Sequence, residues 1–361
     1  MRVTTSKILL LLAMMLAVVS CDEYEINIDT QVFRDGSCLR TITSGNGELL
    51  MDEEGWDYQE IVLPADTSAK RSSIHGYDAD GNPIWKKDST RTYVLSRRFD
   101  KVEDMSSNQI IQIEGEPIVS KAGLTRSFKW FYTDYTFTET FAGWNDHFNI
   151  LPTFYESEDK VSFWFTGYPE ISKGLTGNEL SDIMSDMSDK MEQWAYAVMW
   201  DIYFQTIAHY YDVLQNPSVD CTTFLSMRDS VIASAWMRDV DFDFWGNDNP
   251  ELRFLDEFFH TDVFAKLEIT EEMNDYGSVL WLQSLGLLHV EMPYTLKMPG
   301  KVTDAGRGQI EDGVIKYRFE GSFLIPGDYT FTATSRCVNV WAFLLSGLIL
   351  VVAVGSFFIK R

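Results

Sequence analysis

The stretch that most constrains this chain is its last long apolar run, Val338 to Ile359. It holds 22 residues without a charged side chain and is followed by Lys360 and Arg361. A helix with a rise of about 1.5 Å per residue would extend this run over about 33 Å, enough to cross the hydrocarbon core of a bilayer. The run therefore predicts a transmembrane helix over residues 338–359. The Lys-Arg pair predicts a cytoplasmic C-terminus, with the preceding chain outside the cell.

The start of the chain has the pattern of a secretory signal peptide over residues 1–20. Arg2 and Lys7 precede the apolar run Ile8–Val19, which is short and one-sided for a membrane span. The run ends in Val-Val-Ser before Cys21, which resembles the lipobox of bacterial lipoproteins. That resemblance implies cleavage before Cys21 and acylation of its thiol, for example with palmitate. Asp22 resembles a signal for retention at the cytoplasmic membrane, with the ectodomain on the periplasmic side. The alternative is an uncleaved signal anchor.

The charge balance excludes some partners. The chain carries 54 acidic and 30 basic residues, a formal net charge of −24. The part between the two apolar runs is more negative still, because both runs and their flanks contain basic but no acidic residues. Such a charge argues against nucleic acid and against broad adhesion to anionic headgroups. We expect an envelope protein, a lipid or a glycan as the partner, beside the membrane itself.

Three further cysteines follow Cys21, namely Cys38, Cys221 and Cys337. An oxidising exterior would allow one disulfide among them, and Cys38 with Cys221 is the pairing we predict, because Cys337 adjoins the apolar run. No Cys or His spacing indicates a zinc site.

The chain between the apolar runs divides into three blocks. Residues 21–170 are β-rich, with a hairpin signal at Asp35-Gly36. Residues 171–290 have helical spacing, clearest between Ile183 and Ile202, with Asn178 as the expected N-cap. Residues 291–337 have the turns and short runs of a β-meander. The predicted fold class is α+β: an antiparallel sheet from both β blocks, the helical block inserted between them, and the C-terminal transmembrane helix.

The stretch Phe128–Phe141 is dense in aromatic residues. Its aromatic residues change face near Asp134, which predicts a bulge or turn there. Beyond this point Tyr135, Phe137 and Phe141 share a face that Glu139 interrupts. The stripe predicts a strand packed on a core, with a ligand-stacking face as the alternative.

Two segments near the ends of the β blocks resemble a known family. The later one is Met298–Thr303 (MPGKVT), followed by Gly308 and Val314–Tyr317; the earlier one is Val32–Ser37. Together they resemble the opening hairpin and closing strands of LppM-type lipoprotein domains. The resemblance implies an envelope-anchored, non-enzymatic domain that meets lipids or glycolipids.

The chemistry-bearing cluster of the sequence is acidic. Asp239, Asp241 and Asp243 alternate with apolar residues, and Asp248 follows. On an extended segment this places three carboxylates on one face, an arrangement that suits a hard cation such as calcium. It would also serve a metal-assisted hydrolase. The alternative is a half-buried segment with a solvated acidic edge.

The favoured interpretation is a non-enzymatic binding module at the outer face of the cytoplasmic membrane. The sequence has no GxSxG, P-loop or GxGxxG motif, and we assign no catalytic residue. The metal-assisted hydrolase is one alternative. A structural subunit of a membrane complex is another, with Ala342 and Ser346 as a small-residue face for helix packing.

Overall fold

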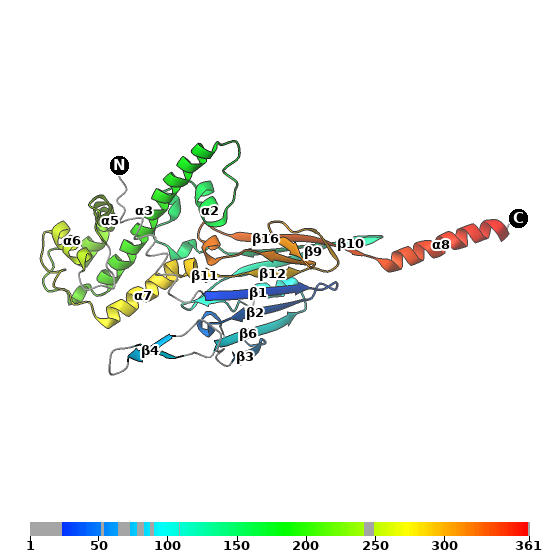
Figure 1. The fold of residues 1–361 in the computed structure, drawn as a ribbon, viewed down its shortest axis with the longest axis horizontal. Coiled ribbons are helices and arrows are strands. Elements are labelled where there is room, and N and C mark those ends of the chain that lie inside the picture. The colour runs from blue at the N-terminus through cyan, green and yellow to red at the C-terminus, as the bar shows by residue number, and fades with distance from the viewer. Residues whose placement is uncertain are drawn as a thin grey trace. The chain divides into compact units, whose positions relative to one another are not determined.

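The computed structural model describes residues 24–51, 54–63, 73–77, 83–86, 90–107, 109–241 and 249–359. Within these residues the chain is α+β and divides into two compact units, each described by itself (Figure 1). The helical unit contains residues 143–289 and 322–327. The β unit contains the described parts of residues 22–142, 290–321 and 328–361.

The β unit is built from short strands at both ends of the described chain. Those before the helical unit are β1 (Tyr24–Val32), β2 (Cys38–Ser44), β3 (Asp57–Leu63), β4 (Ser73–Tyr77), β5 (Pro83–Lys86), β6 (Thr90–Phe99), β7 (Gln112–Ile113), β8 (Glu116–Pro117), β9 (Ser120–Lys129) and β10 (Tyr132–Phe141). Those after it are β11 (Val290–Glu291), β12 (Tyr294–Lys297), β13 (Lys301–Asp304), β14 (Gln309–Glu311), β15 (Val314–Tyr317) and β16 (Tyr329–Val338).

Two main sheets form, where the sequence predicted one antiparallel sheet. The larger has the order β14-β15-β12-β1-β2-β6-β3, with β11 also pairing β1. Strand β1 pairs antiparallel with β2 but parallel with β11 and β12, so this sheet is mixed. The parallel pairing is possible because the helical unit separates these strands in sequence and supplies the long connection that parallel neighbours need.

The smaller sheet has the order β13-β16-β10-β9. Strands β9 and β10 form a hairpin whose two-residue turn is Trp130-Phe131, so the break predicted near Asp134 lies three to four residues earlier. From Thr133 onward β10 alternates buried and half-buried residues without interruption. The face that carries Tyr135, Phe137 and Phe141 is buried, as the aromatic stripe predicted.

The core of the β unit lies between the two sheets. Tyr294 of the larger sheet stacks on Phe331 of the smaller one, with ring centroids 4.7 Å apart. Phe141 packs on Phe319 at 4.8 Å. These rings are almost fully buried, and burying a large side chain stabilises the fold by about 1.5–3 kcal/mol.

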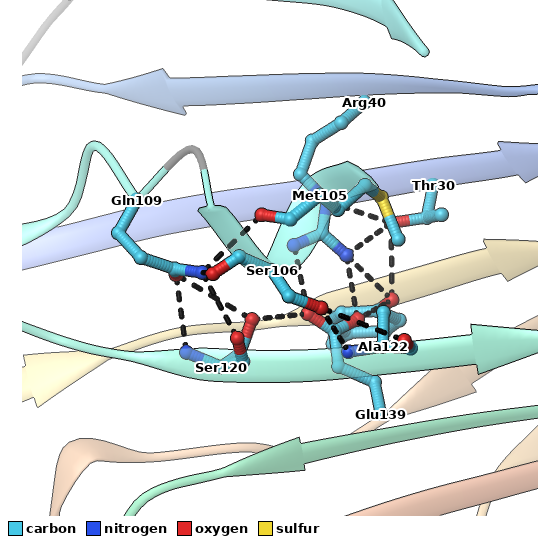
Figure 2. A network of polar contacts seen from close by, with 9 residues as sticks. Thr30, Arg40, Met105, Ser106, Gln109, Ser120, Ala122 and Glu139 are labelled. Carbon is cyan, nitrogen blue, oxygen red and sulfur yellow. Dashed lines mark hydrogen bonds and ion pairs between the residues drawn. The ribbon is translucent and has the colours of Figure 1, made fainter. Parts of the chain in front are cut away.

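A buried polar network crosses this core (Figure 2). Arg40 of β2 donates to both carboxylate oxygens of Glu139 on β10, at 2.8 and 2.6 Å. The Tyr294 hydroxyl, at 2.5 Å, and the Ser120 hydroxyl, at 2.7 Å, also donate to Glu139. Arg40 further donates to Thr30 Oγ1. Glu139 is fully buried and four donor contacts surround its carboxylate, so the charge is compensated within the core.

The network shifts the titration of its members. Burial alone would raise the pKa of Glu139, but the charge and hydrogen bonds of Arg40 outweigh it and hold that pKa below its usual value. The pKa of Tyr294 is raised, first by burial and then by the adjacent Glu139 carboxylate. The network therefore holds an ionised Glu139 and a neutral Tyr294 at neutral pH.

The helical unit contains α2 (Glu158–Thr166), α3 (Gly177–His209), α4 (Cys221–Ser226), α5 (Arg228–Met237), α6 (Pro250–Phe259) and α7 (Glu271–Leu285). Its longest helix, α3, begins after Thr176, whose side chain accepts from the Glu179 backbone while Glu179 bonds back to Thr176. This capping box lies two residues before the predicted cap Asn178 and satisfies donors that an open helix end leaves unpaired.

The last element is α8 (Val340–Ile359), which extends from the end of β16 (Figure 1). Within the described residues, no helix has the combination of length and unbroken apolar character that a membrane crossing requires. Val338 is the last residue of β16 and α8 begins only at Val340, so the helix is shorter than the predicted run. The transmembrane helix predicted over Val338–Ile359 is therefore not supported, and the predicted fold class is corrected accordingly.

Candidate functional site

The most unusual surface of the β unit is the turn between β9 and β10. Trp130 and Phe131 form the turn, and both rings remain more than 40% exposed. Phe128, at the end of β9, is 60% exposed. Two-residue hairpin turns usually carry Asn, Asp or Gly, which adopt the required backbone most easily. Here the turn instead exposes the apolar ring of Phe131 and the ring of Trp130, which combines an apolar body with a polar N–H.

Asn339 joins this hairpin to α8. Its backbone N–H donates to the Phe131 carbonyl at 2.9 Å, and its side-chain amide donates to the carbonyls of Lys129 and Trp130. The side-chain oxygen of Asn339 accepts from Thr133 Oγ1 at 3.2 Å. One residue between β16 and α8 thus satisfies several backbone groups at the hairpin tip, and this fixes where α8 begins.

The first turns of α8 pack on the same hairpin. Trp341 stacks on Phe128, with ring planes 4° apart, and meets Trp130 edge-on at 5.3 Å. Phe343 packs on Phe131 at 4.7 Å. We call these five residues, Phe128, Trp130, Phe131, Trp341 and Phe343, the aromatic collar.

Two small residues of α8 lie close to its junction with the rest of the β unit. Ala342 is fully buried, and Ser346 Oγ accepts a hydrogen bond of 2.9 Å from Trp130 Nε1. These are the residues that the sequence offered as a packing face for a second membrane helix. In the structure both serve contacts within the chain.

Beyond the collar, α8 exposes apolar side chains in every direction. Consecutive residues of an α-helix point about 100° apart, so an unbroken run from Leu348 to Val352 covers the whole circumference. All five of these side chains are more than half exposed. A helix that packs on one partner surface has an apolar stripe and a polar face, whereas a helix that is apolar all round is suited to an apolar environment on all sides.

Charges near the collar are paired with one another. Asp134 accepts from Lys129 at 3.1 Å and from two nitrogens of Arg336 at 2.6 and 3.2 Å. The guanidinium of Arg336 also lies over the Tyr132 ring, 3.9 Å from its centroid. Hydrogen bonding from Arg336 is the main cause that lowers the pKa of Asp134. This part of the surface has two cations and one carboxylate, so little net positive charge faces outward.

The predicted acidic cluster is described only in part. Asp243 and Asp248 lie outside the described residues. Asp239 follows α5 in a left-handed conformation with φ of 55°, and its N–H donates to the Trp236 carbonyl, so it belongs to a helix-terminal turn and not to the extended segment expected. Among the described residues no group of three or more His, Cys, Asp or Glu side chains is arranged to hold a metal. The calcium site over Asp239, Asp241, Asp243 and Asp248 remains an untested prediction.

The cysteines do not form the predicted pair. Cys38 lies buried on β2 of the β unit, Cys221 begins α4 of the helical unit, and both are free thiols, as is Cys337. Burial raises the pKa of Cys38 to about 12, which suppresses the reactive thiolate. Cys21, the predicted acylation site, lies outside the described residues.

Sequence reasoning missed the two features that stand out in the structure. The aromatic collar joins residues about 200 positions apart, and no local pattern links Phe128 with Trp341. The buried network had one visible signal, because Glu139 interrupts an otherwise aromatic face. A carboxylate at a core position requires a cation or several donors, and Arg40 and Tyr294 supply them.

Comparisons of the chain with protein-family models, characterised proteins and solved structures found no match. The resemblance to LppM-type domains therefore stays a prediction.

Proposed function

We propose that this protein is a non-enzymatic binding module of the cell envelope, held at a lipid membrane by α8 and the aromatic collar. The observation that carries the proposal is the apolar, exposed surface on all sides of α8, which begins at a ring of aromatic residues. The proposal concerns the burial of α8 in lipid and does not require that α8 crosses the bilayer.

Lipid explains both parts of this surface. A protein groove would cover one stripe of the helix, but hydrocarbon chains can surround it completely. Tryptophan and other aromatic residues concentrate where a protein passes from water into lipid, because their rings combine an apolar body with a polar edge. In the collar, Trp130 uses its N–H to hold Ser346, so the aromatic ring and the helix enter the lipid together.

Burial of apolar area supplies enough energy for this attachment. Each Val, Leu, Ile or Phe side chain moved out of water contributes about 1.5–3 kcal/mol. Only a few of the exposed side chains of α8 are needed to exceed the marginal attachment that a single acyl chain provides. Because the cations at the collar are paired with Asp134, we expect the attachment to depend little on salt.

Acylation of Cys21 is a second, independent part of the proposal. Its support is the lipobox-like sequence that ends at Cys21. An acyl chain there would attach a second point of the protein to the same membrane surface, and two attachments together give stable residence. The resemblance to LppM-type domains adds lipids and glycans to the partners expected of such a module.

Flotation of the full-length protein with neutral lipid vesicles tests the attachment. We compare the unmodified chain with a variant that carries Leu348→Asp and Val352→Asp; both wild-type side chains are more than 60% exposed, so the fold loses few contacts. A charge placed in hydrocarbon costs about 2.5–3.5 kcal/mol, so each substitution should reduce partitioning by about 100-fold.

The matched control is Phe154→Asp, which replaces an apolar side chain that is 70% exposed in the helical unit. This variant should float with the vesicles as the unmodified chain does. Equal flotation of the α8 variant and the unmodified chain would contradict the attachment through α8.

A further inference from the structure

Two adjoining hollows open on the helical unit. One, of about 210 Å³, lies between α3, α7 and the segment around residue 149; the other, of about 300 Å³, lies between α3 and the junction of α4 with α5. Asn149, Asp201 and Gln205 line both hollows, so these three side chains form the boundary that the hollows share. Together the hollows make one polar groove with two compartments.

Asp201 organises this boundary. It lies on α3 and is 4% exposed. One carboxylate oxygen accepts from the Asn149 amide at 3.0 Å and from the Gln205 amide at 2.8 Å. The other oxygen accepts from the Arg228 guanidinium at 3.1 Å. The carboxylate is thus engaged by three donors, and its role is to orient the two amides and the guanidinium toward the groove.

The orientation leaves the amides with hydrogen-bonding capacity for a ligand. Each amide has two N–H donors and a carbonyl oxygen, and only one donor of Asn149 and of Gln205 is used by Asp201. Gln283 and Ser284 also line the first compartment; the Ser284 hydroxyl donates to the His147 carbonyl at 3.3 Å and can still accept a hydrogen bond. The groove therefore offers neutral donors and acceptors side by side, with the exposed apolar side chain of Leu225 in the wall of the second compartment.

Charge narrows the ligand class further. Asp146 and Asp229 line the compartments and disfavour an anion. Arg228 lines the second compartment and pairs with Asp201 at 3.1 Å and with Asp229 at 2.9 Å, so its charge is compensated there. Neutral hydroxyl groups, which donate and accept at once, match the remaining amide and hydroxyl groups.

We propose that this groove binds a neutral saccharide, with one sugar ring in each compartment and with Asn149 and Gln205 bonding hydroxyl groups of both rings. The inference rests on the proposed binding module for its biological setting and names its ligand class. Every residue that carries it belongs to the helical unit, whereas α8 and the collar belong to the β unit.

Saturation-transfer NMR on the full-length protein in detergent micelles tests the proposal. The probes are neutral disaccharides of hexoses and of N-acetylhexosamines, with inorganic phosphate and spermidine as the anionic and cationic controls. We expect signal transfer to at least one disaccharide and to neither control. Because the protein is in micelles, the experiment does not depend on attachment to vesicles, so its failure and a failure of flotation are separate results.

The test variants are Asn149→Leu and Gln205→Leu, each of which should weaken binding of the responding disaccharide by about tenfold, the effect of about 1.4 kcal/mol for a lost set of hydrogen bonds. The matched control is Gln193→Leu, on the same helix α3 but outside both hollows, which should bind as the unmodified chain does. The proposal is overturned if no disaccharide of the set responds, if phosphate or spermidine binds instead, or if both test variants bind as well as the control variant.

Discussion

Replacing Glu139 by glutamine tests how strongly the β unit depends on its buried ion pair. The substitution keeps the size of the side chain and so creates no cavity. The guanidinium of Arg40, which is 8% exposed as a side chain, keeps its charge and loses its counter-ion. Removal of one partner from a buried pair costs about 3–5 kcal/mol, because the other charge remains buried without compensation. We expect Glu139→Gln to lower the free energy of unfolding by that amount.

The measurement is urea unfolding of the full-length protein in detergent micelles, followed by near-ultraviolet circular dichroism. Its matched control is Glu311→Gln. Glu311 pairs with Lys316 at 2.6 Å, but both side chains are more than half exposed. Exposed pairs contribute at most about 1 kcal/mol, so the control should unfold close to the unmodified chain.

A double variant separates an unpaired charge from a general disturbance of the core. Arg40→Met with Glu139→Leu removes both charges and keeps the core filled, so we expect it to recover most of the stability lost in Glu139→Gln. If Glu139→Gln costs no more than Glu311→Gln, the reasoning about the buried pair is refuted.

The remaining predictions concern stability and processing. The side chain of Glu156 is 8% exposed. Burial alone would raise the pKa of its carboxyl, but hydrogen bonds from two lysines and a backbone N–H outweigh burial and lower that pKa from 4.5 to about 2. Its contribution to stability is therefore complete above about pH 4.5 and is lost as the pH falls toward 2; acid unfolding of Glu156→Gln should show a shallower decline over this range. Gly300→Ala should destabilise the β unit strongly, because a Cβ there would lie 2.7 Å from Cys337 Sγ and closer still to the β16 backbone, whereas Gly313→Ala, equally left-handed but in open space, should cost less in thermal unfolding. Mass spectrometry of the protein from a bacterial host should find an acylated Cys21, and the modification should be absent from Cys21→Ser.

The sequence predicted those parts of the fold that depend on local periodicity. Helical spacing placed the core of α3, and period-two alternation placed β10, because these patterns reflect which face an element buries. Turn signals were less informative. The hairpin tip at Trp130-Phe131 has none of the usual turn residues, so the break was predicted near Asp134 instead.

Long-range pairing could not be predicted in the same way. The parallel alignment of β1 with β12 depends on contacts between residues that the whole helical unit separates in sequence. The groove at Asp201 brings together Asn149, Gln205 and Arg228 from three separate segments, and none of them has a motif around it. The extended backbone expected at Asp239 does not form, because Asp239 ends a helix in a left-handed turn, and the metal site itself stays a prediction.

The most direct test of the membrane attachment is quenching of tryptophan fluorescence by brominated lipids. Vesicles with bromine atoms close to the headgroup, or deep in the acyl chains, are compared for the unmodified chain and for a variant with Trp130→Phe and Trp341→Phe. The fluorescence of Trp130 and Trp341 is the signal that the unmodified chain has and the variant lacks. We predict that bromine atoms close to the headgroup quench this signal more than deep bromine atoms do, because the collar lies where α8 enters the lipid. Equal quenching of both proteins at every depth would contradict it.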